Sequence, residues 1–251
     1  MRINNYISSS GYCSRRKADE YIKNGKVKIN GLKADIGQNV NDDDIVEVLG
    51  KKIVFKNIPV YIAFNKPIGI TCTTDRKING NIIDFIGYKE RIFPIGRLDK
   101  DSEGLILLTN DGNIVNEILR SSNNHEKDYV VTVDKNIDTN FINDMSNGIK
   151  IFNPVRNEYT ITKKCKVAKI NNNVFKITLT QGLNRQIRRM CNSLGYNVIN
   201  LKRIRIMNIE LKNLPTGSWR HINKIEIKNM MDLLKIIKWL SLKNFLYFFI
   251  Y

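Results

Sequence analysis

Asp99 lies in a short segment, residues 96–104, that mixes acidic and basic side chains in a way suited to catalysis. The segment holds three carboxylates and two cations. Neighbouring cations, Arg97 among them, favour the ionised form of the Asp99 carboxyl group. An ionised carboxylate serves better as a nucleophile or a base than as a general acid. A charged surface turn is one alternative, and a glycosidase that pairs Asp99 with Asp101 or Glu103 is another.

A second segment, Gln181–Met190, brings three arginines to the expected start of a helix. Arg185 precedes Arg188 by three residues and Arg189 by four, so the three share one helix face. Cations at a helix N-terminus oppose the helix dipole. The arrangement therefore indicates an anionic partner, either a phosphate or a buried carboxylate. A basic surface helix is the alternative interpretation.

A third segment carries Tyr129 at the entrance of a predicted strand, directly after His125, Glu126, Lys127 and Asp128. Taken alone, a tyrosine in this position is more typical of core or cross-strand packing than of a reactive site. Its importance therefore depends on which other residues lie near it.

The net charge of the chain points to a polyanionic partner. Among the 251 residues there are 41 Lys and Arg but only 24 Asp and Glu, which gives a net charge of +17. Residues 163–212 carry 12 of the basic residues and a single acid, Glu210. A solvated face normally mixes both signs, so this one-sign segment favours contact with nucleic-acid phosphates.

Several protein classes do not fit the sequence. Residues 1–5 lack the apolar core of a secretion signal, and no run of about 18 apolar residues could form a membrane-spanning helix. The four cysteines are far apart in the sequence and form no metal-binding pair, and there are only two histidines. We expect a cytoplasmic protein without disulfides, metal ions or a membrane partner.

The first 50 residues predict a compact module of two helices and short strands. The helices are expected at 2–9 and, after an N-cap at Ser14, at 15–24. A strand then enters an Asn-Gly turn at residues 30–31. The whole chain is divided into an N-terminal module at 1–50, a basic linker at 51–58, a main domain at 59–232 and an apolar, basic tail at 233–251.

The main domain is expected to combine short helices and strands. Helices are predicted at 82–86, 115–119, 137–145 and 186–194. Strands are predicted at 60–64, 105–108, 129–133, 174–179 and 204–211. A helix packed on this domain is expected from residue 230, at the start of the tail, and a helix that lies on a membrane surface is the alternative.

The N-terminal module resembles the S4-type RNA-binding domain in the pattern that runs from Met1 through Gly11–Asp19 to Gly25–Gly31. Behind it, four motifs together resemble the RsuA group of pseudouridine synthases, and the stretch 124–127 is most similar to its RluF-type branch. The motifs are Lys66-Pro67-x-Gly69, Gly96-Arg97-Leu98-Asp99-x-Asp101-Ser102-x-Gly104-Leu105, Glu126-Lys127-x-Tyr129-x-Val131 and Gln181-Gly182-x-x-Arg185-Gln186-Ile187-Arg188-Arg189-Met190.

The resemblance implies an isomerase without a cofactor that converts uridine in RNA to pseudouridine. It implies an α+β fold, with the S4-like module followed by a catalytic domain built on a mixed, largely antiparallel sheet. Asp99 would be the catalytic carboxylate, which either attacks C1′ or removes a ribose proton. Tyr129 would stack on the flipped uracil and assist removal of the C5 proton. Arg188 would pair with Asp99, and Arg97 would enter the space that the base leaves.

The implied substrate is large-subunit ribosomal RNA, and a monomer is expected. Small-subunit ribosomal RNA or tRNA is the alternative substrate, and a non-catalytic S4-type RNA-binding protein is the alternative function. The residues expected to contact RNA are Arg2, Arg15, Arg16, Lys17, Arg97, Arg185 and Arg189.

Overall fold

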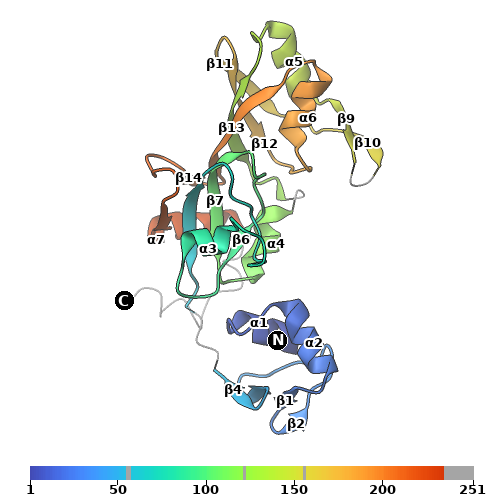
Figure 1. The fold of residues 1–251 in the computed structure, drawn as a ribbon, viewed down its shortest axis with the longest axis vertical. Coiled ribbons are helices and arrows are strands. Elements are labelled where there is room, and N and C mark those ends of the chain that lie inside the picture. The colour runs from blue at the N-terminus through green and yellow to red at the C-terminus, as the bar shows by residue number, and fades with distance from the viewer. Residues whose placement is uncertain (55–57, 121–122, 155–156, 235–251) are drawn as a thin grey trace. The chain divides into compact units, whose positions relative to one another are not determined.

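The computed structural model of the chain describes residues 1–54, 58–120, 123–154 and 157–234. Figure 1 shows the order of its helices and strands. The chain divides into two compact units. The N-terminal unit comprises residues 1–60 with the short segments 88–92 and 109–112, and the large unit comprises residues 61–87, 93–108 and the chain from Asn113 on.

The N-terminal unit packs two helices on a four-stranded antiparallel sheet with the strand order β2-β1-β3-β4. Its elements are α1 (Ile3–Ser9), α2 (Arg15–Lys23), β1 (Val27–Ile29), β2 (Leu32–Lys33), β3 (Val46–Val48) and β4 (Lys51–Ile53). Ser14 accepts a hydrogen bond from the Lys17 backbone N–H at 3.2 Å, which confirms the predicted N-cap of the second helix. The core of the unit is formed by side chains such as Ile3, Ile7 and Ile22, which are at most 2% exposed.

Residues 51–53, assigned above to a basic linker, instead form strand β4. Leu49 and Gly50 both have positive φ angles, 52° and 75°, which is the backbone of a tight hairpin turn. The hairpin continues the ladder, so that Ile53 lies opposite Val46 and is only 7% exposed. Lys51 and Lys52 concealed this strand, because an outward-facing edge can consist of lysines without loss of core packing.

The large unit is built on a nine-stranded sheet whose main path is β11-β12-β8-β13-β7-β5-β15. The strands of this sheet are β5 (Tyr61–Lys66), β6 (Phe93–Ile95), β7 (Glu103–Thr109), β8 (Lys127–Val133), β11 (Lys166–Asn171), β12 (Val174–Leu179), β13 (Val198–Ile206), β14 (Ile209–Glu210) and β15 (Trp219–His221). A separate hairpin contains β9 (Lys150–Asn153) and β10 (Glu158–Ile161). β13 pairs in parallel with β7 and antiparallel with β8, so the sheet is mixed. The expected α+β class is confirmed.

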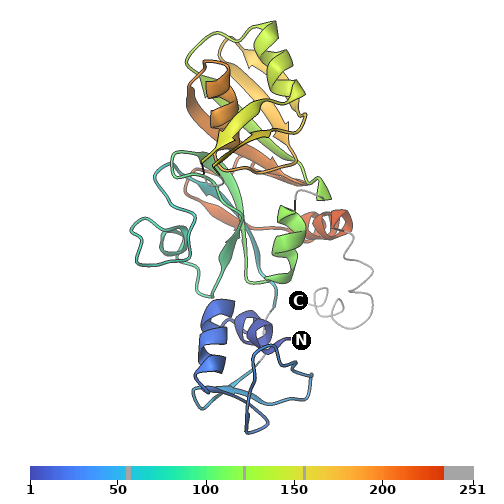
Figure 2. The ribbon, with the colours of Figure 1, turned by 90° about the vertical axis from the view of Figure 1, so that its right-hand side faces the viewer.

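Helices cover both faces of this sheet. They are α3 (Ile82–Ile86), α4 (Asn113–Leu119), α5 (Thr139–Asn147), α6 (Gln186–Ser193) and α7 (Lys224–Leu233). Figure 2 shows α4 and α7 on one side of β5 and β7 and α3 on the other. One core cluster joins Ala63 of β5 to Ile118 of α4 and Met230 of α7, whereas Phe64, the next residue of β5, faces Phe85 of α3 with ring centroids 5.8 Å apart.

Gly104 permits the parallel contact between β7 and β13. Its φ angle is +104°, and a Cβ atom at this position would lie 2.3 Å from the carbonyl oxygen of Arg203. No side chain could be placed there without moving the backbone of β13. This glycine therefore fixes the position of Arg203 relative to the loop that precedes β7.

The predicted strand at 204–211 is wrong in its bounds. β13 begins at Val198 and ends at Ile206, and β14 then returns alongside it. Met207 has a φ of 52° at the reversal, and Asn208 is the single residue there that favours turns. The apolar pattern on either side of this reversal had suggested one continuous strand.

The helix expected at the start of the tail corresponds to α7, which begins earlier, at Lys224. Asn223 and Glu226 form a capping box at its first turn, and Met230 and Met231 are buried in the core. The rest of the tail, 235–251, lies outside the described residues. No helix in the described ranges has the length and apolar character needed to cross a membrane.

Candidate active site

The loop 96–102 connects β6 to β7 and is held in place by hydrogen bonds on two sides. The Ser102 N–H donates to the Asp99 carbonyl at 3.1 Å, and the Gly69 N–H donates to the Lys100 carbonyl at 2.8 Å. Lys66, which is fully buried, donates to the Pro67 and Ile70 carbonyls at 2.8 and 2.9 Å. The Lys66-Pro67 motif thus supports the loop that carries Asp99.

Asp99 and Asp101, two residues apart, lie in different surroundings. Asp99 lines a pocket of about 520 Å³, its side chain is 33% exposed, and its carboxylate lies 3.8 Å from the Arg185 guanidinium. Asp101 does not line the pocket; it accepts two hydrogen bonds from Arg185, at 3.0 and 2.8 Å. The hydrogen bonds from Arg185 lower the pKa of the Asp101 carboxyl. Asp101 is therefore engaged by protein groups, whereas Asp99 faces the pocket.

Arg188 does not pair with Asp99 as the resemblance implied. Its guanidinium donates to the Asp101 carbonyl at 2.8 Å, to the Ser102 hydroxyl at 3.2 Å and to the Val198 carbonyl at 3.1 Å. Its Nε lies 3.4 Å from the Asp101 carboxylate. Arg188 therefore holds the main chain just after Asp99. Among the described residues, the cation that lies within 4 Å of the Asp99 carboxylate is Arg185.

The backbone of Arg185 explains this exchange of partners. The spacing of Arg185 and Arg188 predicts that they share one helix face, but α6 begins only at Gln186. Arg185 is its N-cap and has a left-handed φ of 48°. Its side chain thus leaves the helix direction and reaches both carboxylates. In the structure Arg185 and Arg188 contact a protein carboxylate, that of the exposed Asp101, and RNA contact by Arg185 stays a prediction.

Tyr129, on β8, forms part of the pocket wall and is 9% exposed. Arg203 of β13 lies directly opposite in the ladder, with its guanidinium 6.0 Å from the Tyr129 ring centroid. Arg203 is 4% exposed and donates through Nε to the Leu105 carbonyl at 2.7 Å, while its Nη2 is buried without a hydrogen-bond partner among the described residues.

Lys127 is a second buried cation beside Tyr129, two residues earlier on the same face of β8. It is 8% exposed and makes one long hydrogen bond, 3.4 Å, to the His125 carbonyl. Burial and, second, the charge of Arg203 lower the pKa of Lys127 to about 8. Sequence reasoning gave no role to Lys127 or Arg203. The available signal was a charged residue at an inward-facing position of an otherwise apolar strand.

The pocket has a strongly asymmetric charge. Five of the described side chains that line it are cationic, and one, Asp99, is a carboxylate. Since Asp101 and Glu103 lie outside this lining, the residues described here offer no pair of carboxylates, and the glycosidase alternative is not supported. Among these residues there is also no group of three His, Cys, Asp or Glu side chains that could hold a metal ion.

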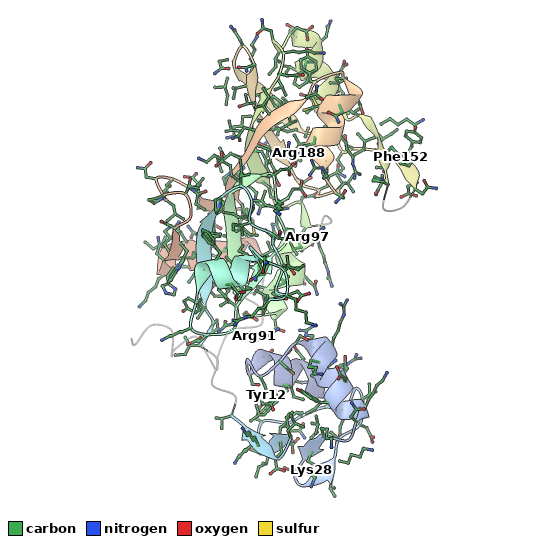
Figure 3. The ribbon with its side chains drawn as sticks, in the orientation of Figure 1. Tyr12, Lys28, Arg91, Arg97, Phe152 and Arg188 are labelled. Carbon is green, nitrogen blue, oxygen red and sulfur yellow. The ribbon has the colours of Figure 1, made fainter. Side chains whose placement is uncertain are left out.

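The other residues expected to contact RNA lie at several places. In the large unit, Arg97 is exposed at the pocket (Figure 3), and Arg189 donates to the Phe152 carbonyl at 3.3 Å. In the N-terminal unit, the exposed residues Arg2, Arg15 and Arg16 and the half-buried Lys17 lie at the starts of α1 and α2. Lys17 forms an ion pair with Glu20 at 2.6 Å. RNA contact by these residues stays a prediction.

The chain is similar to known proteins over nearly its whole length. A family model for RNA pseudouridylate synthase matches residues 60–193, and one for the S4 domain matches residues 1–46. Dual-specificity RNA pseudouridine synthase RluF of Escherichia coli (strain K12) is 52% identical over 240 residues, which are 95% of this chain and 80% of that protein.

Two further relatives agree with this match. Ribosomal large subunit pseudouridine synthase B of Bacillus subtilis (strain 168) is 35% identical over 239 residues, 92% of this chain and 96% of that protein. A crystal structure of a pseudouridylate synthase superimposes with a TM-score of 0.67 at 28% identity and covers 92% of this chain and 99% of that one. The chain therefore belongs to the RNA pseudouridylate synthase family and carries an S4 domain at its N-terminus.

Proposed function

We propose that this protein isomerises uridine to pseudouridine in large-subunit ribosomal RNA, with Asp99 as the catalytic carboxylate. One observation carries the assignment of Asp99: it is the single acid among the described side chains of a cationic pocket. The choice of RNA rests on the relatives, since the B. subtilis protein is a large-subunit synthase by name.

The reaction breaks the N1–C1′ bond, turns the uracil within the site and joins C5 to C1′. The C5 proton leaves, and N1 gains a proton, so the isomerisation needs no net oxidation and we propose that it uses no cofactor. Asp99 acts on the ribose, as the nucleophile at C1′ or as the base that removes a ribose proton. Both roles require an ionised carboxylate.

Three neighbours of Asp99 have proposed roles in this reaction. Tyr129 provides an aromatic face for a base taken out of its stack, as chemistry on a base in folded RNA requires. Arg188 is a positioning residue, because it holds the Asp101 carbonyl and the Ser102 hydroxyl and so fixes the loop of Asp99. Arg97 is proposed to occupy the space vacated by the base.

The charge distribution supports RNA as the partner. The pocket lining carries an excess of four positive charges, and the chain as a whole carries +17. A clustered positive surface attracts phosphates and accelerates association. We propose that the S4 domain adds RNA contacts through α1 and α2, that the protein acts as a monomer, and that it works in the cytoplasm, where ribosomal RNA is modified.

In vitro transcripts of large-subunit RNA, small-subunit RNA and tRNA test this function directly. Each transcript is incubated with the protein, and pseudouridines are mapped by carbodiimide labelling and primer extension. We expect a new pseudouridine in the large-subunit transcript that the Asp99→Asn variant does not produce. The tRNA transcript is included because the E. coli relative is named a dual-specificity RNA pseudouridine synthase. Modification of small-subunit RNA or tRNA alone would contradict the proposed target.

A further inference from the structure

The hairpin formed by β9 and β10 presents an aromatic face that the reaction described above does not use. In its ladder Tyr159 lies opposite Phe152, and Ile161 lies opposite Lys150. Since side chains alternate along a strand, these four residues share one face of the hairpin. All four are exposed: Phe152 to 42%, Tyr159 to 66%, Ile161 to 72%, and Lys150 as well. We call them the hairpin platform.

The opposite face of the hairpin anchors it to the large unit. Ile151 is 1% exposed and Asn153 is 8% exposed. Because burial is confined to this face, the hairpin platform contributes little to the stability of the fold. Exposed aromatic residues in a group generally mark an interaction site.

The hairpin platform has the composition of a nucleic-acid stacking surface. The rings of Phe152 and Tyr159 lie 5.3 Å apart at an angle of 58°, and the Lys150 ammonium lies 4.9 Å from the centre of the Tyr159 ring. Proteins that bind single-stranded nucleic acid combine aromatic rings, on which bases stack, with cations that follow the backbone.

The charge around the hairpin favours RNA over an apolar protein partner. Residues 150–166 contain five basic residues and a single acid, Glu158. A protein-docking patch of this kind would normally have a mixed polar rim, whereas a one-sign rim complements a phosphate backbone.

The hairpin is tied to the helix that lines the pocket. Arg189 of α6 donates to the Phe152 carbonyl at 3.3 Å, and its neighbour Arg188 lines the pocket. Figure 3 shows Phe152 on the hairpin that extends beyond α6, with Arg188 nearer to the strands of the sheet. Two consecutive residues of α6 therefore connect the pocket to the hairpin platform.

We propose that the hairpin platform stacks an unpaired base of the substrate RNA that flanks the target uridine. The proposal rests on the proposed function for the identity of the RNA, but the stacking itself does not depend on catalysis. Stacking tolerates any base, because every base has a flat π face. The hairpin platform would therefore recognise an unpaired nucleotide rather than a particular sequence.

Three substitutions of Tyr159 test this proposal. Tyr159→Ala should weaken binding to the large-subunit transcript by about 5- to 150-fold, the range measured for loss of one base–aromatic stack. Tyr159→Phe should bind within about twofold of the wild type, because the ring alone is needed. Tyr159→Leu, which keeps apolar contact area but no ring, should behave like Tyr159→Ala. Ile225→Ala on α7, another exposed apolar position (73% exposed), is the matched control and should change nothing.

Two further measurements separate stacking from other effects. A single-stranded RNA that contains 2-aminopurine should lose fluorescence when it binds the wild type or Tyr159→Phe, and much less when it binds Tyr159→Ala. At saturating RNA, the turnover of Tyr159→Ala should equal that of the wild type, since Tyr159 lies outside the pocket lining; the loss should appear in KM.

Clear results would overturn the proposal. Unchanged RNA affinity and unchanged 2-aminopurine quenching in Tyr159→Ala would exclude stacking on this face. Wild-type binding by Tyr159→Leu would indicate an apolar contact, and a change of sedimentation coefficient in Tyr159→Ala would indicate an interface between copies of the chain. If the wild type forms no pseudouridine but Tyr159→Ala still loses affinity and quenching, the proposed function fails and the stacking surface stands.

Discussion

The two faces of strand β8 differ in how their charges are balanced. On one face, Asp128 accepts hydrogen bonds from Arg205 at 2.8 Å through each carboxylate oxygen and from Thr178 at 2.8 Å, and it pairs with Lys176 at 2.9 Å. On the other face, Lys127 of β8 and Arg203 of β13 are buried beside Tyr129, and no described carboxylate forms an ion pair with either of them.

Lys127 and Asp128 are adjacent on β8, yet the charge of Asp128 is balanced by its neighbours and that of Lys127 is not. A buried ion pair whose partners are fully hydrogen-bonded costs little once formed, although removing one partner is expensive. A buried cation without a counter-ion is a standing cost, because desolvation of the charge is not offset. Lys127 and Arg203 therefore leave an unbalanced positive charge on the pocket face of β8, whereas Asp128 and Arg205 hold neighbouring strands of the sheet together.

The largest effect is expected for Asp99. The pocket face of β8 has no carboxylate of its own, and the loop 96–102 supplies this one. Asp99→Asn should reduce pseudouridine formation by more than about 10³-fold, because the amide is neither nucleophile nor base. The melting temperature and RNA affinity should change little. Asp101→Asn is the matched control: it loses its ion pair with Arg185, so it should lower the melting temperature and keep measurable turnover. Near-normal turnover of Asp99→Asn would refute the assignment.

On the paired face, Asp128→Asn should lower the free energy of unfolding by about 3 kcal/mol, the cost of leaving a buried charge without its partner. Hydrogen bonds from Arg205 and the other donors lower the pKa of Asp128 to about 2, from a usual 3.8. Its stabilisation is therefore complete above pH 4 and is lost as the pH falls towards 2. Urea unfolding of both proteins between pH 7 and 2 should show the difference shrinking with acidification; a constant difference would contradict this account.

On the pocket face, Tyr129→Phe should keep the ring and remove the hydroxyl. We expect RNA affinity close to that of the wild type and product formation reduced by about 10²-fold, the size of a typical proton-transfer contribution. Filter binding and single-turnover assays measure the two quantities separately. If affinity collapses while the remaining complex reacts at the normal rate, the hydroxyl is structural and Tyr129 belongs with the packing residues.

An effect of opposite sign on stability is expected for Lys127→Met. The pKa of Lys127 falls from a usual 10.5 to about 8, which corresponds to a cost on the order of 3 kcal/mol while the amine is charged. The unfolded chain binds the additional proton between pH 8 and 10.5, so the wild type gains stability as the pH rises through this window.

Lys127→Met should consequently be at least as stable as the wild type at pH 7, and its advantage should shrink as the pH rises from 8 towards 10. Its affinity for RNA should fall, since a donor in the pocket is lost. Thermal melts across this pH range, together with RNA binding at pH 7, are sufficient measurements. A variant that is less stable than the wild type at every pH would show that Lys127 has a stabilising partner. The charges on the two faces of β8 would then both be balanced.

Local features of the chain were readable from the sequence. The Ser14 cap, the helix at 82–86, the helix predicted at 186–194 and observed at 186–193, and the strand at 174–179 depend on side chains within a few residues of each other. The motif residues Asp99 and Tyr129 were also found from the sequence, because their segments have recognisable patterns. Strands β9, β10, β11 and β15 were missed. β9, β10 and β15 are short, and β10 and β11 are exposed along nearly their whole length.

The partners of the charged residues were decided by the tertiary structure alone. Arg185 and Arg188 are three residues apart, yet a left-handed N-cap sends Arg185 to both carboxylates and leaves Arg188 to clamp the loop. Arg203 reaches Tyr129 because β13 pairs with β8, and Gly104 lets the backbone of Arg203 also lie against β7, which is about a hundred positions away in the chain. Sequence spacing specifies neighbours along a helix or strand, but the energy of a charge depends on burial and on ladder partners, which exist only once the sheet has formed.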